Sequence, residues 1–146
     1  MSRLDRIIKK ILRESESDLD KLIEFGEYAE LVNKSEMKIM NELLLLIRES
    51  GIVNMNESAK FLFMTKDHFD AMVAYMKFER GFDEKTIKVL KEASKKIETV
   101  RNIIISASMR YLENQDKELT NENMQPVIRR ILISTLNYYR FGMLPI

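Results

Sequence analysis

Apolar residues recur every three or four positions between Asp83 and Asn114, and polar residues fill the positions between them. This spacing places the apolar residues on one face of an α-helix with 3.6 residues per turn. Asp83 is a suitable N-cap, and neither proline nor glycine interrupts the stretch. The pattern therefore predicts one long helix at about 83–114. The residues expected on its buried face are Ile87, Leu90, Ala93, Ile97, Val100, Ile104, Ala107 and Tyr111.

Shorter stretches with the same periodicity predict further helices before and after the long one. They are expected at 3–14, 18–32, 36–49 and 66–80, and in a C-terminal stretch that follows a polar loop. Either Thr120 or Asn123 can cap the last helix. Asn123 is preferred because proline is tolerated only near the start of a helix, and this cap places Pro126 in the first turn. The sequence thus predicts an all-α fold, a bundle of five to six helices around the long central helix at 83–114.

The chain is expected to form one α-helical domain over residues 1–146, in which 1–14 can be an appended amphipathic helix. Its hydrophobic fraction of 45% is enough for a core, and its 24 Lys and Arg residues nearly balance its 23 Asp and Glu residues. A net charge near zero gives no overall attraction to nucleic acid or to anionic membranes. Locally, residues 17–50 hold eight acidic and four basic side chains, whereas the two ends of the chain are basic.

No apolar stretch is long enough to predict a membrane span, and Ser2–Arg13 lacks the continuous apolar core of a signal peptide. The chain contains no cysteine, which excludes disulfide bonds and thiolate metal sites and suits a reducing compartment. We therefore expect a cytoplasmic protein. The basic helix at 3–14 either docks on the bundle or acts as a free arm on nucleic acid or a membrane surface. Docking is favoured because so short a helix is marginal alone.

The sequence contains no motif that predicts catalysis. The only histidine, His68, stands beside Asp67 and Asp70 but has no metal-binding partner at helical spacing, and such a histidine is more often structural. A glycine-rich phosphate loop and a nucleophile elbow are both absent from the sequence. We therefore expect a protein that is not an enzyme and that uses no cofactor and no metal.

Basic and aromatic residues are the candidates for a contact surface. A lysine stripe on the first half of the long helix is typical of nucleic-acid contact or, as we favour, of a solvated face that acidic residues partly neutralise. Arginines beside tyrosines in the last helix can clamp phosphates and stack bases, or can simply favour the helix C-terminus. The candidates for contact with nucleic acid or a protein partner are Lys88, Lys95, Arg101, Arg129, Arg130, Tyr138, Tyr139 and Arg140.

Four segments between residues 65 and 141 resemble the helical domain of the GINS replication-factor subunits of archaea. The segments are Thr65–Phe69, Val100–Ile104, Leu119–Glu122 and Tyr139–Arg140. In that family, a helix that begins with an acidic and an aromatic residue leads to a long helix with an arginine-rich patch, to which Arg101 corresponds, and then to a helix capped by a Leu-Thr-x-Glu motif. The resemblance implies a non-enzymatic subunit of a tetramer that bridges a replicative helicase to its partners.

A second resemblance lies in Ser58–Leu62 and Phe69–Tyr75. These segments are similar to the C-terminal helix of the small helical subunits of type III CRISPR effector complexes. That family implies sequence-independent contact with RNA or with displaced DNA.

The function expected first is a non-catalytic helical assembly subunit that mediates protein–protein contacts in a nucleic-acid-handling, replication-type complex. One alternative is a small subunit of the CRISPR effector type that binds nucleic acid directly and independently of sequence. Another is a self-associating structural or regulatory protein, such as a viral or plasmid factor. The expected partners are other protein subunits or further copies of the chain, with nucleic acid contacted through the basic residues in the first alternative.

Overall fold

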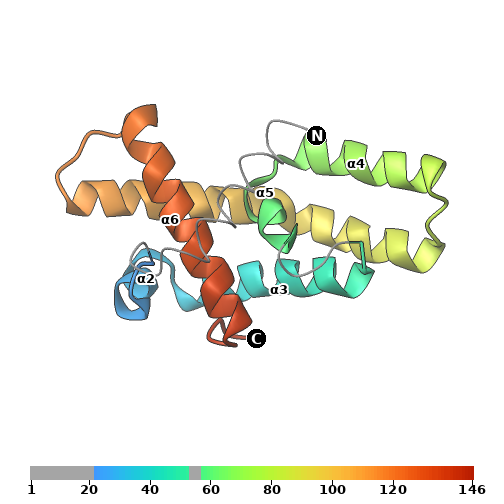
Figure 1. Ribbon diagram of the computed structural model, residues 1–146, viewed down its shortest axis with the longest axis horizontal. Helices are drawn as coiled ribbons and strands as arrows, with labels where there is room; N and C mark the ends of the chain where they lie inside the picture. The colour runs from blue at the N-terminus through green and yellow to red at the C-terminus, as the bar shows by residue number, and fades with distance from the viewer. Residues whose placement is uncertain (1–21, 53–56) are drawn as a thin grey trace.

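The computed structural model describes residues 22–52 and 57–146 (Figure 1). Within these ranges every regular element is helical, and the predicted all-α bundle around a long central helix is confirmed. The elements are α2 (Phe25–Leu31), α3 (Lys34–Ser50), the 3-10 helix η2 (Glu57–Phe63), α4 (Lys66–Glu79), α5 (Glu84–Asn114) and α6 (Asn121–Arg140). The helix predicted at 3–14 lies outside the described residues.

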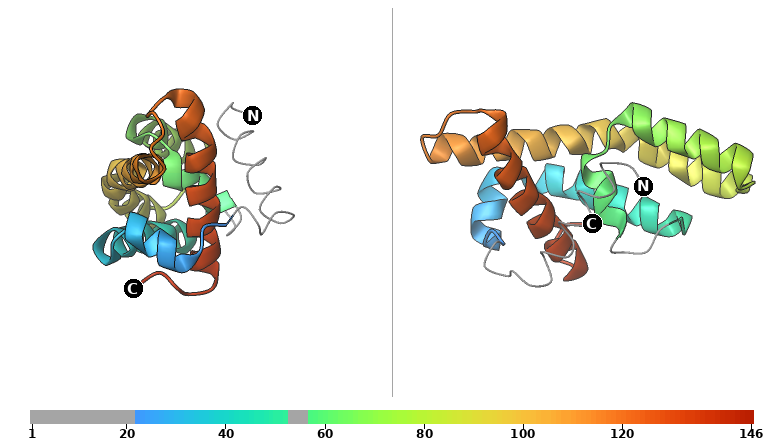
Figure 2. Two further views of the ribbon diagram at one scale, coloured as in Figure 1. Left: turned by 90° about the vertical axis from the view of Figure 1, so that its left-hand side faces the viewer. Right: turned by 45° about the horizontal axis from the view of Figure 1, so that its top comes forward.

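The 31-residue α5 is the central helix, and the other helices pack along it (Figures 1 and 2). Helices α4 and α3 lie on opposite sides of its first half, and α6 crosses its second half. The predicted apolar face of α5 is buried from Ile87 to Ala107, while Tyr111 is half-buried. Ile103 is buried as well as Ile104, because the second half of α5 meets helices of the same chain on more than one side.

Local sequence signals account for most helix boundaries. Helix α3 begins with a capping box, in which the Asn33 side chain accepts from the Glu36 N–H and the Glu36 carboxylate accepts from the Asn33 N–H. It ends at Gly51, whose φ of 71° favours glycine. Thr65 caps α4, and Asp83 caps α5 as the sequence predicts.

The start of α6 corrects one prediction. The cap is Thr120, whose hydroxyl accepts from the Asn123 N–H at 3.2 Å, and Asn123 instead donates its side-chain amide to the carbonyl of Glu118 at 2.9 Å. Pro126 therefore lies inside the helix, beyond the first turn. This position is tolerated because the missing N–H leaves only the Glu122 carbonyl without its helical partner, and Glu122 is exposed to water.

The start of α2 corrects a second prediction. Residues 22–24 are not helical, so α2 begins at Phe25 and not near Asp18 as expected. The reason lies in α6, which satisfies both backbone polar groups of Ile23. The Ile23 N–H donates to the Ser134 hydroxyl at 3.0 Å, and the Ile23 carbonyl accepts from the Tyr138 hydroxyl. A backbone that is already paired in this way gains less from helical hydrogen bonds.

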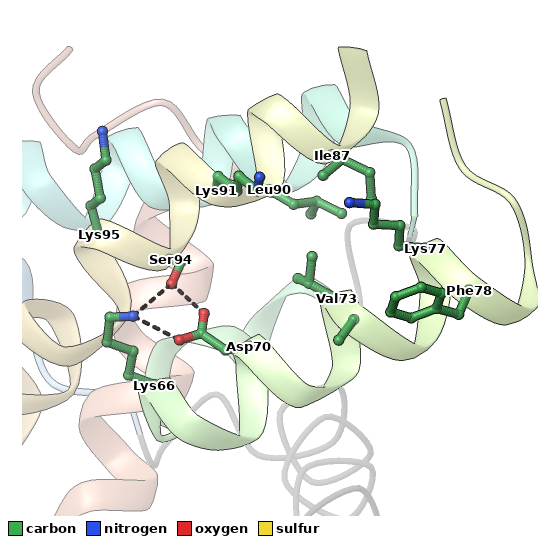
Figure 3. Close-up of a pocket in the computed structure, with 11 residues that line it drawn as sticks. Lys66, Asp70, Val73, Lys77, Phe78, Ile87, Leu90, Lys91, Ser94 and Lys95 are labelled. Carbon is green, nitrogen blue, oxygen red and sulfur yellow. Dashed lines mark hydrogen bonds and ion pairs between the residues drawn. The ribbon is translucent and has the colours of Figure 1, made fainter. Parts of the chain in front are cut away.

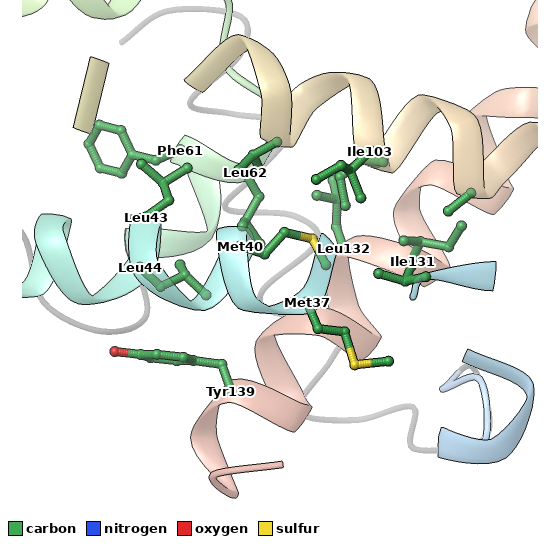
Figure 4. Close-up of a cluster of buried hydrophobic side chains, with 14 of the residues drawn as sticks. Met37, Met40, Leu43, Leu44, Phe61, Leu62, Ile103, Ile131, Leu132 and Tyr139 are labelled. Carbon is green, nitrogen blue, oxygen red and sulfur yellow. The ribbon is translucent and has the colours of Figure 1, made fainter. Parts of the chain in front are cut away.

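The hydrophobic core lies where α3, η2, α5 and α6 meet (Figure 4). The leucine run of α3 divides between core and surface. Leu43, Leu44 and Ile47 are fully buried, whereas Leu45 is 40% exposed. Phe61 and Leu62 of η2 are also fully buried between α3 and α5. Leu45 is thus a leucine of this run whose side chain lies outside the core.

Candidate functional site

The eight contact candidates predicted from the sequence do not gather in one place. Lys88 and Lys95 belong to the first half of α5, and Arg101 follows at its middle. Arg130 of α6 contacts Tyr111, near the other end of α5. Lys88 and Tyr111 are about 35 Å apart along the helix axis at about 1.5 Å per residue. The candidates therefore occupy separate regions of the bundle, and their contact with nucleic acid or a partner stays a prediction.

Arg101 packs against the junction between η2 and α4. Its guanidinium carbon lies 4.4 Å from the centre of the Phe63 ring, within the range of a cation–π contact. Its Nε is buried and has no hydrogen-bond partner among the residues that the structure describes. Thr65, Asp67 and Glu98 line a small hollow beside it, with a volume of about 260 Å³. Arg101 thus holds η2 close to the start of α4.

The arginines and tyrosines of α6 take different roles from one another. Arg130 is half-buried and donates to the Tyr111 hydroxyl, with its guanidinium carbon 5.5 Å from the centre of that ring. Tyr138 and Tyr139 are only 6% and 9% exposed. In this position neither tyrosine presents a ring face on which a base can stack, and both contribute to the core.

A groove between α4 and α5 does gather chemically similar residues (Figure 3). We call it the α4–α5 groove; it has a volume of about 500 Å³. Its lining consists of Lys66, Asp70, Val73, Ala74, Lys77 and Phe78 from α4, and Ile87, Leu90, Lys91, Ser94 and Lys95 from α5. An apolar floor between lysines is suited to a ligand that is both apolar and acidic.

Helix α4 exposes two aromatic rings, one of which lines this groove. Only Phe69 of α4 is buried, and it packs edge-to-face on Phe61 with ring centres 5.7 Å apart. Phe78 lines the groove and is 81% exposed, and Tyr75, three residues before it, is 60% exposed. Large exposed aromatic side chains are typical of protein contact surfaces.

A hydrogen-bonded cluster closes one end of the α4–α5 groove, and Phe78 lies at the other (Figure 3). Lys66 Nζ lies 2.7 Å from Asp70 Oδ2 and 3.2 Å from Ser94 Oγ, and Ser94 donates to Asp70 Oδ1. The hydrogen bond from Lys66, followed in size by that from Ser94, holds the pKa of Asp70 below its ordinary value. The Lys66–Asp70 hydrogen bond also raises the pKa of Lys66. Both groups are charged near neutral pH and compensate each other.

The remaining lysines of the groove differ in their pairing. Lys95 lies 2.9 Å from Glu92. Lys77 and Lys91 have no ion-pair partner within residues 22–52 and 57–146. These two ammonium groups, one from each wall, give the groove its uncompensated positive charge.

A smaller hollow lies on the other side of α5, between that helix and α3. We call it the α3–α5 hollow; it has a volume of about 340 Å³. Leu45 and Leu46 form its apolar part, and its charged residues are Glu42, Glu49, Glu92 and Lys96. Lys96 lies 3.0 Å from Glu42, and Lys95 pairs with Glu92, so Glu49 is the carboxylate of the hollow that the described residues leave uncompensated.

The described residues lack two further features. They contain no group of three or more His, Asp or Glu side chains placed to hold a metal ion. None of their helices combines the length and the hydropathy that crossing a bilayer requires.

Comparison of the chain with protein-family models, with curated proteins and with solved structures gave no match. The resemblances to GINS subunits and to CRISPR small subunits therefore stay predictions.

The α4–α5 groove was not predicted as a site, although its α5 lysines belong to the predicted stripe. The sequence did contain one signal for it. Tyr75 and Phe78 are three residues apart on α4 but lie outside the apolar stripe that runs through Phe69 and Val73. Aromatic residues away from the core-facing stripe of a helix indicate a second apolar surface.

Proposed function

We propose that this chain is a non-catalytic helical assembly subunit that binds protein through the α4–α5 groove. The observation that carries the proposal is the 81% exposure of Phe78, which lines the groove beside an apolar floor. Tyr75, three residues earlier on the same helix, is 60% exposed and enlarges the aromatic surface of α4. Burial of such rings is the main source of binding free energy in many protein interfaces, where Tyr and other aromatics often act as hot spots. The lysines at the rim would orient an acidic partner and raise its rate of association.

The resemblance of residues 65–141 to GINS subunits supports a replication-type, nucleic-acid-handling complex as the setting. Those residues comprise α4, α5 and α6, and Lys66 of the groove lining belongs to the first of the four similar segments. It supports a role in which the chain connects other proteins and leaves catalysis to them.

The test is an affinity pull-down of the tagged full chain from extract of its native cells, with and without nuclease, read by mass spectrometry. The key variant is the double substitution Tyr75→Ser and Phe78→Ser, which removes both rings without touching the core. Phe141→Ser is the matched control, because Phe141 is similarly exposed at 73% but follows the end of α6.

The proposal would be supported by recovery of helicase or other replication proteins that persists after nuclease treatment. These proteins should bind the wild type and the Phe141→Ser control and should be lost with the double variant. Equal recovery with the double variant would show that the groove is not the contact surface. Recovery of nothing but the tagged chain would contradict the assembly role.

Direct binding of nucleic acid is the second candidate function. The observation that favours it is the position of Lys91 and Lys95, one helical turn apart, opposite Lys66 and Lys77 on α4. Binding of a labelled single-stranded oligonucleotide, followed by fluorescence anisotropy, should then fall with salt, with a slope of about −0.7 per phosphate contacted on a logarithmic plot. The double variant Lys77→Ala and Lys91→Ala should reduce the magnitude of that slope by the equivalent of about two phosphate contacts. A flat salt response would exclude this candidate.

A further inference from the structure

Two hollows of opposite charge flank the first half of α5. The α4–α5 groove carries the ammonium groups of Lys77 and Lys91, which are not compensated by the described residues. In the α3–α5 hollow, Glu42 pairs with Lys96 and Glu92 pairs with Lys95. Its third carboxylate, that of Glu49, is exposed and has no ion-pair partner in the same part of the chain. The chain therefore holds both halves of a complementary charge pair on its own surface.

These two surfaces cannot meet within one copy. Lys91 and Glu92 are consecutive on α5, so their side chains diverge by about 100° around the helix axis and belong to different hollows. The body of α5 lies between the hollows, and α4 and α3 form their outer walls. Only a second copy can bring the acidic surface to the basic one.

The apolar side chains match as well as the charges. Glu42, Leu45 and Glu49 are spaced at i, i+3 and i+7 on α3, so they form one stripe about 10 Å long. Leu45 is 40% exposed at its centre. Leu45, with the uncompensated Glu49 one turn after it, complements a groove in which an apolar floor lies beside Lys91. Such a contact is the common mode in which a helix lays an apolar stripe into a groove.

We infer that α3 of a second copy of this chain occupies the α4–α5 groove, with Leu45 on the apolar floor and Glu49 toward Lys91. The inference rests on the proposed function, because it names the protein that the groove binds. Each copy offers both surfaces, so the contact is either reciprocal in a two-fold dimer or repeated from copy to copy.

The test measures self-association of the full chain by sedimentation velocity and by light scattering after gel filtration. The wild type should form an oligomer whose dissociation constant rises at least about tenfold between about 50 and about 500 mM NaCl. Lys91→Glu and Glu49→Lys should each weaken association at least about tenfold at low salt. An equimolar mixture of the two variants should associate again, because each then supplies one intact surface with a matched reversed charge.

Two control variants change the net charge equally at a distance from both hollows. Lys117→Glu and Glu118→Lys lie in the exposed loop between α5 and α6 and should leave association unchanged. Circular dichroism of each variant confirms that a loss of association does not reflect unfolding.

Three results would overturn the inference: a wild-type chain that stays monomeric, an oligomer that neither charge reversal weakens, or a mixture of the two variants that fails to associate. The proposed function is judged separately by the pull-down with Tyr75→Ser and Phe78→Ser. The chain could prove monomeric and yet lose other captured proteins when Tyr75 and Phe78 are replaced. That result would contradict the second copy as the occupant of the groove and would leave the proposed function intact.

Discussion

At the scale of single residues, the polar side chains buried in α6 determine how the N-terminal part of the described chain packs. The Tyr28 hydroxyl is within 2.8 Å of the Thr135 hydroxyl, and both residues are fully buried. Ser134 and Tyr138 bind the backbone of Ile23. Three aromatic rings, those of Phe25, Tyr28 and Tyr138, meet at the same place. The packing of α2 on α6 thus depends on specific hydrogen bonds as well as on apolar area.

Loss of the Tyr28–Thr135 hydrogen bond should be costly when one partner remains. Thr135→Val keeps the shape of the side chain but leaves the buried Tyr28 hydroxyl without this partner, so we expect the free energy of unfolding to fall by about 1–3 kcal/mol. The double variant with Tyr28→Phe should lose less than the sum of the two single variants. Urea denaturation of the four proteins measures the difference, and strict additivity would show that the two hydroxyls do not interact.

Burial also gives stability a dependence on alkaline pH. Desolvation raises the pKa of Tyr28 far above its ordinary value, and burial raises the pKa of Tyr138 as well. Above about pH 10 the unfolded chain loses these protons while the folded chain keeps them. The unfolded state then binds fewer protons, so the free energy of unfolding should fall as pH rises past about 10. Denaturation at about pH 9 and pH 11 measures this, and Tyr28→Phe should make the decrease smaller.

At the scale of elements, α4 is the helix that the bundle holds least firmly. Phe69 is its only buried residue, whereas α5 buries residues along its whole length. The turns of α4 after Phe69 pack on α5 with half-buried side chains such as Met72, Val73 and Met76. Few buried contacts correspond to a low free energy of local opening.

Hydrogen exchange should therefore distinguish α4 from α5. We expect the amides of 73–79 to exchange faster than those of 97–108, as measured by mass spectrometry. Equal protection of the two segments in the wild type would contradict this view of α4.

Phe69→Ala should cost about 3–5 kcal/mol in the free energy of unfolding, because it leaves a cavity beside Phe61.

The same scale explains how far the sequence could predict the structure. The bounds of α5 follow from signals within the segment, since Asp83 caps it and its apolar spacing persists to its end. The local pattern predicts a helix at Ile23, because it carries no information on Ser134 and Tyr138, which lie more than a hundred residues away in the chain. Local preference likewise predicts Pro126 in the first turn, because it cannot show that Glu122, whose carbonyl the proline leaves without a helical partner, is exposed.

At the scale of the whole molecule, charge and apolar surface depend on how the helices pack, and this is why the candidate site was less predictable than the fold. The lysines of α5 were recognised as a stripe, but only packing places Lys91 opposite Lys77 across an apolar floor. Packing also leaves Leu45 outside the core while its neighbours Leu44 and Leu43 are buried. The asymmetry between the two sides of α5 is a property of the assembled bundle and of no single helix.

The buried hydroxyl of Tyr139 has a consequence for heat resistance. Within residues 22–52 and 57–146 it has no hydrogen-bond partner, so these residues do not compensate its removal from water. Tyr139→Phe keeps the ring and deletes this oxygen, and the midpoint of thermal unfolding should rise by a few degrees, about 2–8 °C for each kcal/mol gained. A variant that melts at the same temperature or lower would show that the oxygen is compensated in the folded chain, so the natural chain would not be melting earlier on its account.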